Sequence, residues 1–205
     1  MDDDDTGTLA RPEDRERRAA LLAGPSFAPL DAYCRGIAAR FGPTPHVDPL
    51  DGGTDAHLLL LLETPGPWGA APRFVSRDNP TGTARNLRRF LSTARIERRD
   101  TVLWNAVPWI IHTPGARNRE PRRAEIDMGI SLLPGFVALL QRLRVVVMAG
   151  RTAALAMPIL REARPDLALV AMPHPSPTYV NTSPAVTMRI ATALNQASAC
   201  LSVGG

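Results

Sequence analysis

Apolar runs of strand length alternate with longer amphipathic stretches over most of the chain. Four runs, residues 57–63, 101–107, 144–149 and 167–172, are dense in aliphatic side chains. Such continuous runs are typical of strands that are buried on both faces of a parallel sheet. Helical periodicity follows near residues 82–95, 122–143, 152–161 and 184–199. The alternation predicts an α/β fold of three layers (α/β/α), with a central, mainly parallel four-stranded sheet.

The amino-terminal part has a different pattern. Four consecutive aspartates repel one another and bring nothing to bury, so we expect residues 1–8 to form a disordered acidic tail. Helices are expected over residues 11–22 and 29–41, followed by a long loop rich in proline and glycine. Pro134-Gly135 is expected to break or kink the longest helix. We expect residues 9–205 to form a single domain, because the chain has 205 residues and 44% hydrophobic side chains.

Composition narrows the class of protein. The longest aliphatic run, residues 58–62, is too short to span a bilayer, and the amino terminus lacks a secretory signal pattern, so we expect a cytoplasmic protein without a membrane partner. Two cysteines exclude a disulfide framework and an all-cysteine metal site within one chain. Every basic residue is an arginine, so no lysine is present to form a Schiff base.

Charge is unevenly distributed along the chain. Residues 1–56 hold 11 acids and 6 arginines, whereas residues 57–205 hold 9 acids and 18 arginines. The larger part is therefore strongly basic. A basic surface attracts a polyanion such as nucleic acid, because counterions are released from the phosphates on binding.

The first two predicted strands each end in a polar side chain. Glu63 is followed by Thr64-Pro65-Gly66, and Asn105 lies inside the otherwise apolar run 101–107. Ligands of open parallel sheets bind beyond the carboxyl ends of the strands, so both side chains are site candidates. The alternatives are a solvated acid in a proline and glycine turn, and an amide bonded to neighbouring backbone.

The other two strand ends carry a glycine turn and a proline-rich loop. Gly150 and Thr152 open a helix, which is either a generic connection or an anion contact. In Pro173-His174-Pro175-Ser176-Pro177, three prolines restrict the backbone, so the histidine and the serine are held in position. A histidine fixed in this way at a strand end indicates a catalytic role.

Together these residues resemble the uracil-DNA glycosylase superfamily. The segment 173–177 is similar to its His-Pro-Ser-Pro motif, and Leu103-Trp104-Asn105 is similar to the strand whose asparagine recognises uracil. Glu63-Thr64-Pro65-Gly66 resembles the first motif of the iron–sulfur branch, and Phe74 follows at the distance of the base-stacking phenylalanine. The resemblance covers roughly residues 57–200.

The first motif also departs from the family patterns. Leu62 replaces the usual first glycine of the motif. The classical branch has a catalytic aspartate at the position of Thr64 and a thymine-excluding tyrosine at that of Gly66. The resemblance thus implies an enzyme whose pocket admits bases larger than uracil. Two cysteines cannot supply the four ligands of an iron–sulfur cluster, so we expect no metal and no cofactor.

The resemblance implies a monofunctional glycosylase that extrudes a base from DNA and leaves an abasic site. Phe74 would stack on the base, Asn105 would bind its polar edge, and Gly66 would lie beside it. His174 would stabilise the leaving base, and Glu63, or alternatively Thr64, would hold the attacking water. The expected DNA contacts are Ser176, Gly150, Thr152 and Arg77, with Arg85, Arg88 and Arg89 as further candidates and Thr178, Tyr179 and Val180 at the wedge position.

Two other hypotheses remain at this point. One is a catalytically weak relative that binds damaged or abasic DNA, which is motivated by the missing aspartate at Thr64. The other is a nucleotide-binding α/β enzyme in which Asn105 and His174 share no target. In the favoured hypothesis the partner is DNA that contains uracil or another damaged base, bound by a monomer.

Overall fold

The structure, a computed structural model, describes residues 9–66, 70–113 and 119–202. Its main sheet contains four strands, β2 (Leu58–Leu62), β4 (Thr101–Asn105), β5 (Val145–Ala149) and β6 (Ala168–Met172). All neighbouring strands of this sheet run parallel, in the order β4-β2-β5-β6. The predicted α/β class and the four-stranded sheet are therefore confirmed.

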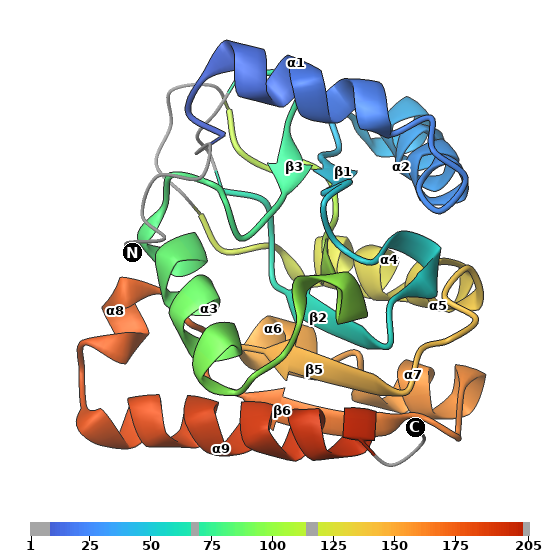
Figure 1. The fold of residues 1–205 in the computed structure, drawn as a ribbon. Coiled ribbons are helices and arrows are strands. Elements are labelled where there is room, and N and C mark those ends of the chain that lie inside the picture. Colours follow the sequence, from blue (N-terminus) through green and yellow to red (C-terminus); the bar gives the residue numbers. More distant parts are fainter. Residues whose placement is uncertain (1–8, 67–69, 114–118, 203–205) are drawn as a thin grey trace.

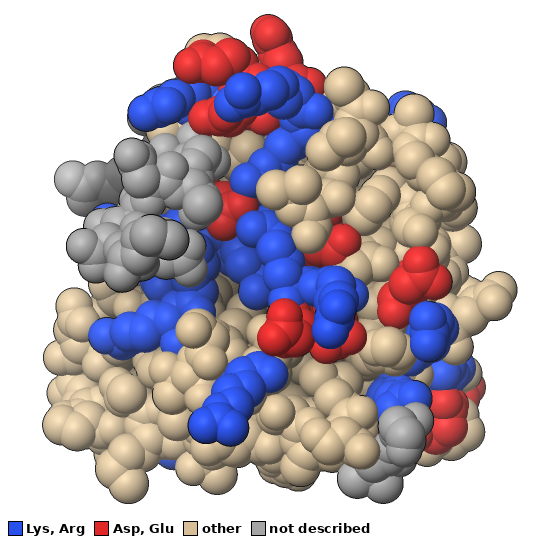
Figure 2. All heavy atoms as spheres, viewed as in Figure 1, with Lys and Arg blue, Asp and Glu red and all other residues tan. Residues whose placement is uncertain are grey.

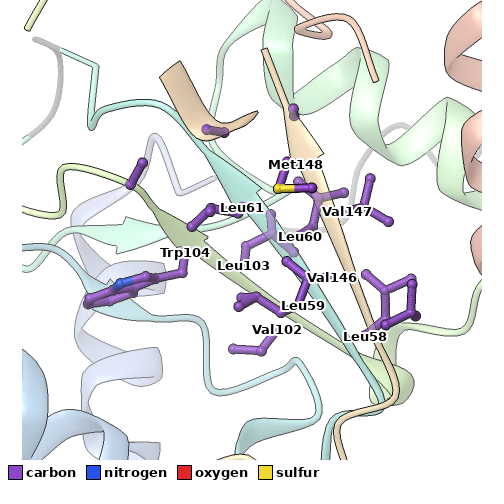
Figure 3. Packing of buried hydrophobic residues seen from close by; sticks show 14 of the residues in the cluster. Leu58, Leu59, Leu60, Leu61, Val102, Leu103, Trp104, Val146, Val147 and Met148 are labelled. Atoms are coloured by element: carbon purple, nitrogen blue, oxygen red, sulfur yellow. The ribbon is translucent and has the colours of Figure 1, made fainter. Parts of the chain in front are cut away.

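The sheet forms because its strands bury apolar side chains on both faces. Leu58 to Leu61 of β2 are fully buried, and their neighbours on β4 and β5 are equally inaccessible. Figure 3 shows these side chains packed together across the three strands. On β4, Trp104 stacks on Phe136 with ring centroids 4.3 Å apart. Burial of this much apolar surface is the main source of stability for such a fold.

Helices cover the sheet on both faces and produce the three layers (Figure 1). The longest, α9 (Pro184–Ser202), packs against β5 and β6 and also contacts α3 (Gly82–Thr93). The remaining helices are α1 (Pro12–Leu21), α2 (Ala28–Phe41), α4 (Arg123–Ser131), α5 (Leu133–Ala138), α6 (Arg151–Ala154), α7 (Met157–Ala163) and α8 (Pro177–Val180), with short 3-10 helices η2 (Gly53–Asp55) and η3 (Arg98–Asp100).

Two predicted helices are divided in the structure. The long one ends at Ser131 and restarts at Leu133, which confirms the predicted break near Pro134. The helix predicted over residues 152–161 was wrong as a single element, because α6 ends at Ala154 and α7 begins at Met157. Pro134 and Pro158 lie in the first turns of α5 and α7, where a proline needs no backbone donor but cannot continue a preceding helix.

A second, two-stranded sheet was not predicted. Its strands β1 (His46–Val47) and β3 (Phe74–Val75) pair in parallel, His46 beside Phe74. Each strand is only two residues long, so neither carries a readable periodicity. The loop expected after residue 41 thus contributes to a small sheet that lies below α1 and beside α2 in Figure 1.

Within the described parts of the chain, no helix is long and apolar enough to cross a membrane. The acidic tail predicted over residues 1–8 lies outside the described residues.

Candidate active site

A cavity of about 430 Å³ lies beyond the carboxyl ends of β2 and β4. This volume is within the usual range of small-ligand sites. The predicted site residues that line it are Glu63, Thr64, Gly66, Phe74, Asn105, His174, Ser176, Thr178 and Tyr179. The structure therefore brings together residues that are up to 116 positions apart in the sequence, between Glu63 and Tyr179.

The strand order explains why these residues meet. The chain passes from β2 to its neighbour β4, then crosses to β5 on the other side of β2. Ligand sites in open α/β sheets lie at such a change of direction, because the connections diverge there and leave a crevice. Leu62 pairs with Asn105 across the two strands, so Glu63 and Asn105 leave the sheet at the same edge.

Asn105 is the most deeply buried polar side chain of the cavity, with 2% of its surface exposed. In the described parts of the chain, its amide forms no hydrogen bond. A buried amide without a partner costs free energy, and it is normally paired. The alternative of an amide bonded to neighbouring backbone is thus wrong, and the amide is available to a ligand.

His174 is held by its own loop. The backbone N–H of Ser176 donates to Nδ1 of His174 at 3.2 Å, so the neutral ring carries its proton on Nε2. Burial lowers the pKa of His174 from its ordinary value of 6.5, and the negative charge of Glu63 opposes this shift. At neutral pH the ring is therefore an uncharged Nε2–H donor.

Glu63 is oriented by the first turn of α6, which directly follows β5. The backbone N–H of Thr152 donates to Oε1 of Glu63 at 3.0 Å. Gly150 permits this approach, because it has a φ of 97° and a side-chain Cβ there would lie 2.4 Å from Oε1. Oε2 of Glu63 forms no hydrogen bond among the residues that the structure describes.

The role predicted for Gly150 and Thr152 needs a correction. Neither residue lines the cavity, and the Thr152 amide is already occupied by the Glu63 carboxylate. This amide is not free to bind a phosphate. The glycine turn instead supports an acidic side chain of the site, because backbone N–H groups that bind phosphate can equally bind a carboxylate.

Arg77 was also predicted wrongly. It is 7% exposed, its guanidinium donates to the Thr101 hydroxyl, and its Nε lies 3.7 Å from Asp51. The side chain therefore points into the protein and is not available to DNA. The sequence showed a basic residue next to a predicted site element, but the direction of the side chain depends on the buried aspartates that surround it.

Phe74 forms one wall of the cavity. It belongs to β3 and is only 4% exposed, because Leu9 and Leu22 pack against it. These contacts fix the ring in place. A fixed aromatic ring is suited to stacking on a planar base.

The His174 loop is braced by two residues of α3 that the sequence analysis missed. The Asn86 side chain donates to the backbone oxygen of Pro175 at 2.9 Å. Gly82 lies so close to Pro177 that a Cβ there would be 2.3 Å from the proline ring. Both contacts join segments about 90 residues apart, so no local pattern could have revealed them.

The outer edge of the cavity is formed by α8. Tyr179 is 45% exposed, and its ring centroid lies 6.4 Å from that of His174. Beyond the cavity, arginines gather over α1 and α3 with acidic side chains among them (Figure 2). Arg85 and Arg89 of α3 are exposed, and Arg88 is partly exposed.

Comparison with family models gives a match over residues 52–196 to the Uracil DNA glycosylase superfamily. The chain belongs to this superfamily. A comparison with curated proteins gives no match. Membership supports a glycosylase, a hydrolase of N-glycosidic bonds that acts on DNA and takes part in DNA repair. The match begins after α1, α2 and β1, although Leu9, Arg15 and Pro45 from this earlier part also line the cavity.

Proposed function

We propose that this superfamily member extrudes uracil from DNA and excises it by hydrolysis, leaving an abasic site. The observation that carries the proposal is the Asn105 amide, which is buried in the cavity and has no partner among the described residues. An amide offers a donor and an acceptor side by side. Uracil presents an N–H next to a carbonyl, whereas cytosine presents the reverse pattern, so a fixed amide discriminates between them.

Stacking and extrusion complete recognition of the base. Removing a base from the duplex costs a few kcal/mol of stacking and pairing. The fixed ring of Phe74 recovers part of this free energy by stacking on the base. Thr178 and Tyr179, at the edge of the cavity, are placed to fill the gap in the duplex, and Ser176 to contact a phosphate. Gly66 leaves space beside the base, so other deaminated bases are further candidates.

His174 supplies stabilisation to the leaving base. When the glycosidic bond breaks, the bonding electrons move onto the base and negative charge develops on its O2. An uncharged Nε2–H donor binds this oxygen, a type of contact worth roughly 3–4 kcal/mol in the transition state. The bond from the Ser176 N–H to Nδ1 keeps the donor on the other nitrogen.

Glu63 activates the water. With Oε1 held by Thr152, Oε2 is able to accept a proton from a water in the cavity. The water oxygen adds to C1′ as the base departs, and its proton passes to the carboxylate. Thr64 also lines the cavity and is the second candidate to position this water. Because the chain has no lysine, water is the nucleophile and the strand is not cut. We propose that the protein acts as a monomer.

The test is base release from oligonucleotides that carry uracil, hypoxanthine or a G·T mismatch, with abasic sites cleaved by alkali. We expect product with uracil, and a loss of at least about 100-fold in His174→Ala and Glu63→Gln. Matched controls are His57→Ala, a half-buried histidine at the opposite end of β2, and Glu162→Gln, an exposed acid of α7. Both controls should retain activity.

Three outcomes would contradict parts of the proposal. Release of no base from any substrate would overturn the catalytic assignment, and tight binding of abasic DNA in its place would favour the non-catalytic alternative. Full activity in both site variants would show that His174 and Glu63 do not have the proposed catalytic roles. Strand cleavage before alkali treatment would contradict the monofunctional mechanism.

A further inference from the structure

Two arginines line the cavity on the side of α1, and neither has an acidic partner among the described residues. Arg15 belongs to α1 and is 8% exposed, and Arg73 immediately precedes β3. Neither forms an ion pair within 4.0 Å in the described chain. A buried cation without a counter-charge is expensive, and buried charges are normally paired.

The contacts of Arg15 use only part of its guanidinium. Nη1 donates to the backbone oxygens of Leu9 and Ala10, at 2.9 and 2.8 Å. Nε is buried without an acceptor, and Nη2 has no partner in the described part of the chain. Nε is inaccessible, so the two N–H groups of Nη2 are the ones that remain for a ligand that enters the cavity.

Arg73 is only partly buried, and it too has no carboxylate partner in the described chain. It donates to the backbone oxygen of Gly66, which also lines the cavity. Burial lowers the pKa of Arg73, and no nearby carboxylate opposes this shift. The two carbonyl-bound arginines thus place positive charge on a cavity whose described lining has one acidic residue, Glu63, and Glu63 forms no ion pair with either of them within 4.0 Å.

The rest of the protein shows that this arrangement is unusual for the chain. Arg18, one turn along α1 and equally buried, pairs with Asp48 and Asp78. Arg98 pairs with the same two aspartates. Buried arginines outside the cavity therefore have carboxylates around them. The exception occurs where a ligand has access.

We propose that Arg15 and Arg73 form a subsite for an anionic oxygen group of the DNA substrate. This inference rests on the proposed action on DNA. The group is either the phosphodiester next to the extruded nucleotide or a carboxylate carried by the base, and both offer the planar or forked oxygens that arginine binds well. Arg15 lies outside residues 52–196, so the amino-terminal helix adds this subsite to the superfamily cavity.

The experiment measures binding to oligonucleotides whose 2′-fluoro-deoxyuridine resists cleavage. One set carries a neutral methylphosphonate at the linkage on either side of the uridine, and a second replaces uracil by 5-carboxyuracil. The proteins are the wild type, Arg15→Gln, Arg73→Gln and the control Arg17→Gln, which makes the same charge change on an exposed side chain of α1. Urea unfolding verifies that each variant is folded, and Arg15→Lys replaces Arg15→Gln if that variant unfolds.

Two results would support the subsite and identify its ligand. If it binds a phosphodiester, one methylphosphonate weakens wild-type binding by about 10-fold or more, and the effect disappears in Arg15→Gln and Arg73→Gln but persists in Arg17→Gln. If it binds a carboxylate, the wild type prefers 5-carboxyuracil to uracil by about the same factor, and only the two cavity variants lose this preference.

Cavity variants that respond to both modifications as the wild type does would overturn the subsite, and so would a wild type that binds none of the oligonucleotides. The readout is binding, so it is independent of base release. A wild type that shows the arginine-dependent effect but releases no base would retain the subsite and reject the proposed catalysis.

Discussion

Arg15 and Arg18 are three residues apart on α1 and almost equally buried, yet they extend into two different polar regions. Arg18 enters a cluster of charges in which Asp48 pairs with two arginines and Asp78 pairs with the same two and, at 4.0 Å, with Arg88. Arg15 enters the cavity, where it meets only backbone oxygens. The charge cluster consists of Arg18, Arg77, Arg98, Asp48, Asp51 and Asp78.

In the charge cluster, paired groups serve the fold. The network connects α1 to the segments before β2 and after β3, and a serine hydroxyl, Ser76, completes it. Burial raises the pKa of Asp78, but Arg98 and Arg18 outweigh this and leave it lowered. Asp51 is the exception: its oxygens accept no hydrogen bond from described residues, and burial together with the charge of Asp48 raises its pKa to about 7.

In the cavity, we propose that unpaired groups bind the ligand. The Asn105 amide, part of the Arg15 guanidinium and Oε2 of Glu63 have no partner in the described chain. A site whose polar groups satisfied one another would have little left for a substrate. The two regions therefore differ in charge pairing: Arg18 and Arg98 of the charge cluster lie beside aspartates, whereas Arg15 has no carboxylate within 4.0 Å in the described chain.

The largest expected effect is the loss of one arginine from the charge cluster. Arg18→Met should lower the free energy of unfolding by about 3–5 kcal/mol, because it removes one partner of a buried ion network. Arg15→Met should lower it by at most about 2 kcal/mol, because no buried carboxylate is left unpaired. Urea denaturation of both variants measures the difference. Equal losses would show that the two arginines are not distinguished by pairing.

A second comparison uses two polar residues of β4. Asn105→Leu should change the free energy of unfolding by less than about 1 kcal/mol, since its amide has no described partner, while uracil release slows by about 100-fold. Thr101→Val, at the opposite end of the strand, loses bonds to Arg77 and Arg98, and should cost about 1–3 kcal/mol with normal uracil release. Urea unfolding and single-turnover assays measure the two effects. A strongly unstable Asn105→Leu protein would refute the contrast.

The smallest effect concerns the titration of His174. Its pKa lies below 6.5, so uracil release should be maintained at neutral pH. Release should fall in acid, because a protonated ring has no acceptor for the Ser176 N–H. The charge of Glu63 favours the protonated ring, so Glu63→Gln should lower the pKa of His174 further. NMR titration measures this shift, with His57 as an internal control. A raised His174 pKa in the variant would contradict the described geometry.

Much of the fold followed from local pattern. Runs such as Leu58–Leu62 are apolar throughout, because strands covered on both faces meet hydrocarbon everywhere. Strand ends then indicated Glu63, Asn105 and His174, which the structure places around one cavity. Strands β1 and β3 could not be predicted, because a strand of two residues is defined only by its hydrogen bonds to the partner strand.

The errors at the site share one physical cause. A sequence shows that Arg77 and Thr152 are polar and close to site elements, but their direction and occupancy depend on distant residues. Asp51 and Thr101 surround Arg77, and Glu63 occupies the Thr152 amide. Gly82 and Asn86 were missed for the same reason, since their contacts with the His174 loop exist only after folding.

The sequence by itself determined which side chains reach the carboxyl ends of the strands, because strand length and burial are set by local apolar pattern and proline position. The tertiary structure decided which of those side chains find partners. Hydrogen bonds and ion pairs act over a few ångströms, so they depend on elements that only the folded chain brings together. For this reason Arg18 pairs with aspartates while Arg15 binds only backbone oxygens in the described chain, although the two are neighbours on one helix.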